Sequence, residues 1–335
     1  MLATSQPPQH YRGAATVSDL LKKIDARTKL AGTNKLEILL FTLGMDTRSG
    51  RRENFGINVF KVREVMRTPE ITQAPEMPPA VEGMVSLRGN LIPVIDLASY
   101  VGVKTDSKPD IMIVSEYNGH TQGFLVEAVD TILRLDWSQM RVPPEMLNNN
   151  LRGLVTAVTE LDSGKLVMML DVEKVLAETN QLDDSAEFKT IRPVSDLVGK
   201  TVFYADDSAI ARKQIQRTLD ALELNYVEAI NGKRAWDELQ RIAAQAEVLG
   251  KPVRDFVHMI LTDVEMPEMD GYMLTKTVKG DPRFAGIPIL MHSSLSGMSN
   301  QKLGQSVGVD AYVAKFEPHK LTEAITTMLR NAAQH

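Results

Sequence analysis

The segment ILTDVEMPEMDG, residues 260–271, decides how the second half of this chain is interpreted. An apolar run ends in Asp263, and the polar residues after it reach Pro267 and then Asp270-Gly271. A continuous apolar run that stops at turn residues is typical of a strand covered on both faces. Taken alone, the segment leaves two interpretations of Asp263: a loop residue at a strand end, or a chemical group.

Residues 201–330 repeat one pattern around this segment, because short apolar runs alternate with stretches of helical periodicity. The apolar runs read TVFYA, NYVEAI, DFVHMILTD, IPILMHS and AYVAK. Helices are expected at residues 208–222, 232–249, 271–278, 298–307 and 319–330. Strands that alternate with helices form a parallel sheet, so this half is predicted to be an α/β domain.

Polar side chains follow four of the five predicted strands: Asp206 and Asp207, Asp263, Ser293 and Ser294, and Lys315. The carboxyl ends of parallel strands lie at one edge of a sheet, where ligands of such sheets bind. Crowded carboxylates repel one another unless a cation neutralises them, and Mg²⁺ prefers carboxylate and phosphate oxygens. A carboxylate can also form an aspartyl-phosphate, whose oxygens Lys315 and the Ser293 hydroxyl could contact.

Each of these residues also has a simpler explanation. The Asp206-Asp207-Ser208 run could simply be a helix cap without a chemical role. Asp263 could be a loop residue, and the two serines could be turn residues. Lys315 could be an ordinary solvated lysine. We favour chemistry because all of them fall at the carboxyl ends of predicted strands.

Residues 36–176 have a different texture, with short β-rich runs separated by Gly, Asn, Asp and Pro. IMIVSEY and HTQGFLV flank Asn118-Gly119, which predicts a hairpin with a tight turn. Many short strands with little helix favour barrels or a sandwich. This half has no catalytic signature, and the lone His120 is interpreted as structural or solvated. A binding surface is therefore expected.

Composition limits the remaining possibilities. The 335-residue chain carries a net charge of −5 without a basic stripe, which argues against nucleic-acid binding. It contains no cysteine, and neither a signal peptide nor an apolar run long enough for direct membrane insertion is expected. We expect a flexible tail at residues 1–35 that includes a short amphipathic helix at 17–30, a β domain at 36–177, a linker at 178–196 and the α/β domain at 197–335.

The segments FYADDS, ILTDVEMPEMDG, PILMHSS and AYVAK resemble the receiver domains of two-component response regulators. The resemblance covers residues 195–335 and implies a flavodoxin-like (βα)5 fold with strand order 2-1-3-4-5. It also implies roles for individual residues. Asp263 would be the phosphoacceptor. Asp206, Asp207 and the Glu265 backbone carbonyl would bind Mg²⁺ together with Asp263. Ser293 would be the switch hydroxyl, Tyr312 the switch aromatic and Lys315 the lysine that binds the phosphoryl group.

Two features depart from the receiver pattern. Phe316 stands where receivers usually have a proline after the lysine, which concerns the geometry of that loop. The spacing between Asp207 and Asp263 is also longer than usual, with the excess around residues 243–254. The second helix or the loop after it is therefore expected to be extended.

The segments FGINVFKVREVM, GMVSLRGNLIPVIDL and EAVDTIL resemble CheW-like coupling domains of chemotaxis systems. The resemblance implies two small SH3-like barrels that bind chemoreceptors and the histidine kinase CheA. It places Val62 and Gly83 at the receptor-facing groove and matches Glu64 and Arg88 to a charged pair. Val62 could instead be a simple core residue. The charged pair could have a structural role alone, which is to hold the groove in shape.

The two halves in this order resemble CheV-type chemotaxis proteins. The resemblance implies a cytoplasmic adaptor, recruited to membrane receptor arrays, that couples methyl-accepting chemotaxis receptors to CheA, with CheW as a further candidate partner. Its receiver would take a phosphoryl group from phosphohistidine and later lose it, so the chain is expected to be a phosphoacceptor and not an enzyme. The alternatives are a phosphate sink that drains CheA, and a structural adaptor with an inert receiver.

Overall fold

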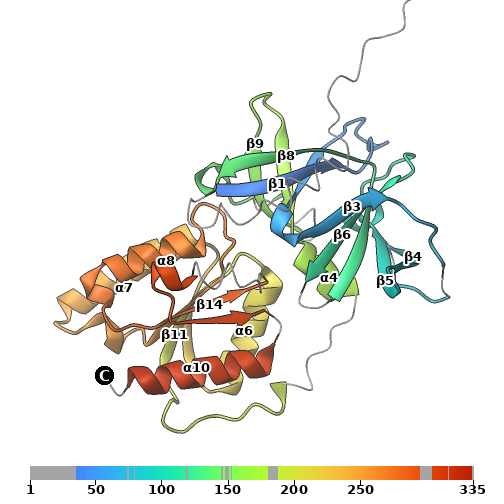
Figure 1. Cartoon of the computed structure of the whole chain (residues 1–335). Coiled ribbons are helices and arrows are strands. Elements are labelled where there is room, and N and C mark those ends of the chain that lie inside the picture. The colour runs from blue at the N-terminus through green and yellow to red at the C-terminus, as the bar shows by residue number, and fades with distance from the viewer. Residues whose placement is uncertain are drawn as a thin grey trace, which may run out of the picture.

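The structure is a computed structural model in which two domains follow one another along the chain (Figure 1). It describes residues 35–73, 75–78, 80–117, 120–144, 146–147, 151, 153–179, 188–294, 304–315 and 317–333. The helix expected at residues 17–30 and the departure at Phe316 lie outside these residues. The helix expected at 298–307 is described only from residue 304 onward. No helix in the described part is long and apolar enough to cross a membrane.

The first domain contains two five-stranded sheets, as expected for a pair of small barrels. One sheet has the order β8-β1-β2-β10-β9, with bounds Ala128–Asp136, Lys35–Thr42, Asn54–Asn58, Leu166–Leu170 and Val155–Glu160. The other has the order β3-β6-β7-β5-β4, with bounds Val62–Arg67, Ile111–Tyr117, His120–Val126, Asn90–Asp96 and Val81–Leu87. β6 and β7 pair antiparallel, which confirms the predicted hairpin. The side chain of His120 lies outside the described part.

One apolar core joins the two sheets. Phe41 and Phe55 enter it from one sheet, and Val65 and Phe124 enter it from the other. Two short helices pack into the same core, α2 (Leu97–Val101) and α4 (Val172–Thr179). Helix α4 was not predicted from the sequence, and it extends past the expected domain end at residue 177. Because Val172 and Val175 anchor it in the core, its polar side chains are held at a fixed edge of the domain.

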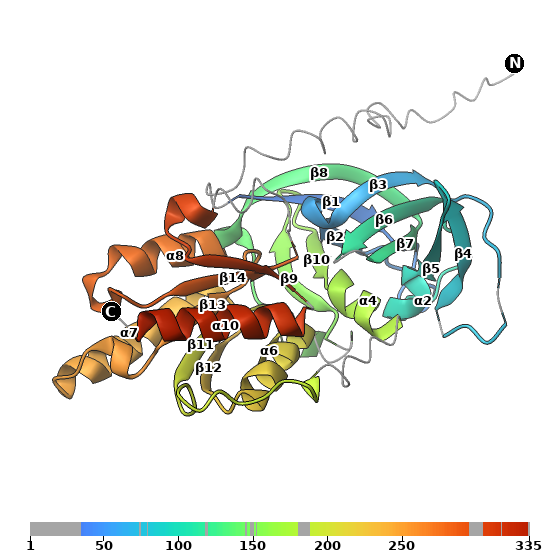
Figure 2. The same cartoon turned by 60° about the horizontal axis from the view of Figure 1, so that its bottom comes forward.

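The second domain is a parallel five-stranded sheet of order β12-β11-β13-β14-β15, which confirms the predicted 2-1-3-4-5 arrangement. The strands are Asn225–Ala229, Thr201–Ala205, Met259–Thr262, Ile289–Ser293 and Ala311–Ala314 in that order. Four helices are described from end to end: α6 (Ala209–Ala221), α7 (Gly232–Val248), α8 (Gly271–Gly280) and α10 (Pro318–Ala332). Helices α6 and α10 share one core, and α7 and α8 share the core on the other face (Figure 2).

Successive strand residues point to opposite faces of this sheet, which explains the continuous apolar runs. Phe203 and Ile260 pack under α7 and α8, whereas Tyr204 and Leu261 pack under α6 and α10. The extra length between the acidic segments lies in α7, which has 17 residues, and in the segment leading to the 3-10 turn η4 (Val253–Asp255). This extension lies away from the carboxyl edge of the sheet, because it precedes β13.

Replacing Gly271 by alanine should destabilise the receiver. A Cβ at Gly271 would lie 1.9 Å from the backbone oxygen of Asp263, so the loop that carries Asp263 would have to move. Overpacking of this kind costs about 1–3 kcal/mol. Gly280→Ala, at the other end of α8, is the matched control because a Cβ there meets nothing within 4 Å. Urea unfolding of the receiver should show the loss for Gly271→Ala alone, and equal stability of both variants would contradict the packing.

The buried His292 should make the receiver less stable at acidic pH. Burial, aided by the nearby Lys315 charge, lowers the pKa of His292 to about 3. The unfolded chain therefore binds a proton near pH 6.5 that the folded state does not bind, and stability falls as pH falls from about 6.5 towards 3. This linkage amounts to about 2 kcal/mol between pH 7 and pH 5.

The variant His292→Leu isolates this effect. The difference in unfolding free energy between His292→Leu and the parent should shift by about 2 kcal/mol in favour of the variant when the pH is lowered from 7 to 5. Urea titrations of the receiver at the two pH values measure it. A difference that does not change with pH would mean that His292 takes up its proton in the folded state.

Candidate phosphoacceptor site

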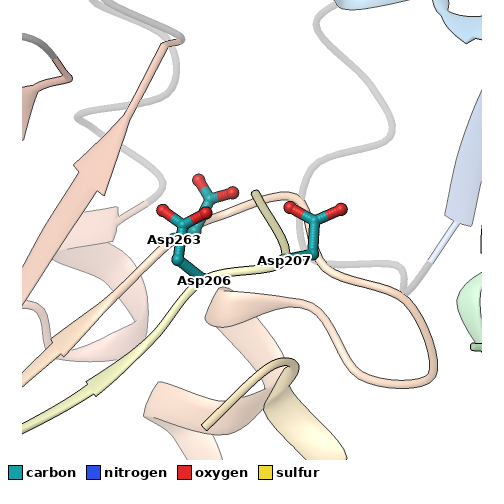
Figure 3. A group of neighbouring side chains, drawn as sticks. All are labelled: Asp206, Asp207 and Asp263. Atoms are coloured by element: carbon teal, nitrogen blue, oxygen red, sulfur yellow. The ribbon is translucent and has the colours of Figure 1, made fainter. Parts of the chain in front are cut away.

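Three aspartates meet at the carboxyl edge of the receiver sheet (Figure 3). Asp206 and Asp207 follow β11, and Asp263 follows β13, the strand beside it. One carboxylate oxygen from each lies within 4.8 Å of the others. The sequence prediction that these three acidic side chains come together is therefore confirmed by their positions.

Lys315 closes this group from the end of β15. Its Nζ lies 2.8 Å from Asp206 Oδ2 and 2.9 Å from Asp263 Oδ2. The side chain of Lys315 is only 1% exposed, so the interpretation as a solvated lysine is wrong. A buried ammonium that touches two carboxylates fixes three strand ends relative to one another.

Backbone groups hold Asp263 in place. Its N–H donates to Ala205 O at 2.8 Å, and its Oδ1 accepts from the N–H of Val264 at 2.6 Å. The N–H of Gly271 donates to Val264 O at 2.9 Å, which ties the start of α8 to the same loop. The Asp263 carboxylate is thus oriented by the N–H of Val264, and backbone hydrogen bonds hold the loop that carries it.

The simpler capping interpretation of the Asp-Asp-Ser run is also confirmed. Ser208 is the N-cap of α6 and accepts from the N–H of Ala211, and Asp206 Oδ1 accepts from the N–H of Ser208 at 2.9 Å. Oδ1 of Asp206 holds the N–H of the N-cap residue Ser208, whereas Oδ2 faces Lys315. One carboxylate therefore positions the N-cap residue of the helix and belongs to the acidic group at the same time.

The charge state of this group favours a bound cation. Burial first, and then repulsion from Asp263, raises the pKa of Asp207 to about 8. Burial also raises the pKa of Asp206 and of Asp263. A cation among three such carboxylates relieves their repulsion, and an all-oxygen donor set suits Mg²⁺. The residues present therefore fit the magnesium site that a receiver domain implies.

The expected switch residues lie beside the acidic group. Ser293 is fully buried at the end of β14, and its side chain shares a hydrogen bond with Tyr312. Tyr312 packs with Val264, Tyr272 and Met291 in a small apolar cluster. The hydroxyl and the aromatic ring thus already contact each other, as an exchange of positions between them would require.

Residues of the first domain enter this site, which the sequence did not predict. Glu173, at the start of α4, has a side chain that is 2% exposed, and its Oε2 lies 3.6 Å from Lys315 Nζ. Its Oε1 lies 2.9 Å from Lys61 Nζ and accepts from Ser294 Oγ at 2.7 Å. Burial opposes the charge of Glu173, but Lys315, Lys61 and Ser294 outweigh it and lower the pKa.

Glu265 also joins the two domains. The prediction used only its backbone carbonyl, but its buried carboxylate accepts from Asn58 Nδ2 and lies 3.7 Å from Lys61 Nζ. Burial raises the pKa of Glu265 to about 7.

A sequence signal for the contacts between the domains was the pair Asp171 and Glu173, which comes after the buried strand β10. Asp263 was found from the same pattern, an acidic residue after a buried strand.

The four residues expected at the coupling surface lie in the second sheet of the first domain or its turns. Arg88 Nη2 lies 2.9 Å from Glu64 Oε2, so the charged pair is formed. Gly83 has a φ of 151°, and a Cβ there would lie 2.4 Å from Thr72 O, which explains the glycine. Val62 is 1% exposed, as the interpretation as a core residue requires.

Comparison with known proteins assigns a family to each domain. Residues 37–180 match the CheW-like domain, and residues 202–326 match the response regulator receiver domain. A crystal structure of the scaffolding protein TtCheW from Thermoanaerobacter tengcongensis is 28% identical, with a TM-score of 0.36, over 41% of this chain and 84% of that one.

Relatives from Helicobacter pylori span both domains. The chemotaxis protein CheV3 of Helicobacter pylori is 31% identical over 279 residues, covering 82% of this chain and 88% of CheV3. The chemotaxis protein CheV1 of the same organism is 28% identical and covers 94% of this chain and all of CheV1. With a CheW-like domain followed by a receiver, and this similarity over most of its length, the chain belongs to the CheV family of chemotaxis proteins.

Proposed function

We propose that this chemotaxis adaptor couples chemoreceptors to the histidine kinase CheA, and that Mg²⁺-dependent phosphorylation of Asp263 adjusts the coupling. The observation that carries the proposal is the buried Lys315, whose ammonium lies within 2.9 Å of both Asp206 and Asp263. It sets a cation beside a carboxylate nucleophile, where the charge of a transferred phosphoryl group develops. The CheW-like domain supports the assignment of chemoreceptors and CheA as partners, since CheW-like domains serve as scaffolds between receptors and kinase.

The transfer follows from the side chains present. An oxygen of Asp263 supplies the electron pair of the new O–P bond as the P–N bond to phosphohistidine breaks. The imidazole takes the electron pair of the P–N bond and, with a proton on its other ring nitrogen, leaves as the neutral ring. Lys315 and Ser293 contact the phosphoryl oxygens. Bound Mg²⁺ would be held by Asp206, Asp207, Asp263 and the Glu265 backbone carbonyl, and would neutralise charge on the phosphoryl oxygens. Hydrolysis of the acyl-phosphate resets the site, so the chain is a phosphoacceptor rather than an enzyme.

The signal would then leave the site through Ser293 and Tyr312. Ser293 moves towards the phosphoryl oxygens, and Tyr312 fills the space that the hydroxyl leaves. This exchange is supported by their present hydrogen bond and by the small apolar cluster around Tyr312. We place the protein in the cytoplasm at receptor arrays, where CheA and the receptors are found together.

Asp263→Ala should abolish Mg²⁺-dependent labelling by phosphorylated CheA, because the nucleophile is lost. Asp237→Ala on the exposed face of α7 is the control and should be labelled like the parent. In a reconstituted mixture of receptor, CheA and this protein, kinase activity should respond to phosphorylation in the parent and not in Asp263→Ala. Full labelling of Asp263→Ala would refute the site, and rapid hydrolysis without any change in coupling would favour the phosphate sink.

Arg88→Ala should weaken binding to receptor or CheA by about fivefold or more, as expected for an interface arginine. Its pair with Glu64 is largely exposed at the arginine, so stability should change by only about 0–1 kcal/mol. Arg134→Ala is a matched control, because it breaks a similarly exposed pair with Glu37 in the other sheet. Sedimentation or pull-down binding assays compare the two, and equal binding would remove Arg88 from the coupling surface.

A further inference from the structure

The carboxylate of Glu173 occupies the phosphoryl-binding side of the receiver site. Three groups surround it: Lys315 and Ser294 of the receiver and Lys61 of the CheW-like domain. Lys315 is the cation that the proposed transfer needs, and Ser294 follows the proposed switch residue directly. An anion supplied by the other domain therefore lies against the ammonium that would contact a phosphoryl anion.

The contact extends beyond this one side chain. Helix α4 packs against α6, and the side chain of Asp171 hydrogen-bonds Ser208 at the start of α6. The 3-10 turn η2 (Val59–Lys61) brings Lys61 to Glu265. In the turn η3 (Trp137–Gln139), the backbone oxygen of Trp137 accepts a hydrogen bond from the N–H of Glu268 at 3.1 Å. Three segments of the CheW-like domain thus cover the loops that carry Asp206 and Asp263.

The phosphoacceptor is buried in the docked arrangement. Asp263 is 3% exposed there, which restricts the approach of a phosphodonor to its oxygens while the domains remain docked. A phosphoryl group also adds three acceptor oxygens and about two negative charges. Those charges would face the ionised Glu173 across Lys315, and the added oxygens would compete for the same ammonium.

We propose that docking of the CheW-like domain and phosphorylation of Asp263 exclude one another, with Glu173 holding the place of the phosphoryl group. The inference rests on the proposed phosphorylation of Asp263. Docking protects the unphosphorylated site, and phosphorylation expels Glu173 and separates the domains. Lys61 directly precedes Val62 at the start of β3, so separation also frees the residue before the strand that carries Glu64 of the expected coupling surface.

Two measurements test this on the full-length chain. The first is the rate at which acetyl phosphate with Mg²⁺ labels Asp263. Glu173→Gln keeps a hydrogen-bonding group but removes the charge held by Lys315 and Lys61, so it should label about tenfold faster, which corresponds to about 1.4 kcal/mol of lost docking. Glu178→Gln, near the end of the same helix with a side chain 46% exposed, should label at the parental rate.

The second measurement is the distance between the domains. The chain has no cysteine, so spin labels can be attached at Leu91→Cys in β5 and Val248→Cys in α7, both highly exposed. The unphosphorylated parent should give one narrow distance distribution. Treatment with acetyl phosphate, or the Glu173→Gln change alone, should broaden it and shift it. Lys61→Met removes the other side of the contact and should act in the same direction as Glu173→Gln.

The outcomes separate this inference from the proposed function. Equal labelling rates in the parent, Glu173→Gln and Lys61→Met would overturn the inference while leaving Asp263 as the phosphoacceptor. Unchanged distances in Glu173→Gln and in the phosphorylated parent would overturn it as well. Separation of the domains in Glu173→Gln without labelling of any variant would support the contact and refute the phosphorylation.

Discussion

The ammonium of Lys315 is the interaction on which the carboxyl edge of the receiver depends. Burying carboxylates next to one another is costly unless a cation offsets their charge, and Lys315 reaches Asp206 and Asp263 from a strand at the edge of the sheet. The ends of β11, β13 and β15 are held together as a result. The same ammonium then has one side left to face an anion, and in this structure Glu173 lies on that side.

The receiver site could be predicted from the sequence because a parallel sheet converts order along the chain into proximity. Once five strands were predicted, the residues after them had to share one edge, whatever their separation in sequence. Apolar strands around Asp263 and Ser293 made the strand ends easy to locate. Capping of α6 by Ser208 could be predicted for the same local reason, and it coexists with the acidic group rather than competing with it.

The contact between the domains could not be predicted in this way. Glu173 and Lys61 lie on a short helix and a 3-10 turn, and no local periodicity states which surface of another domain will cover them. Helix α4 itself was missed, because its eight residues are stabilised by apolar contacts of Val172 and Val175 with a core built by distant strands. The side chain of Glu265 was overlooked because resemblance to receivers assigned a role only to its backbone.

The ion pair between Glu173 and Lys315 joins residues that belong to separately recognisable modules. A receiver transplanted from another protein would bring its own lysine but would meet an acidic helix fitted to different loops. The two modules of this chain therefore have to diverge as one unit, and chimaeras that keep both folds intact would still lose the match between them.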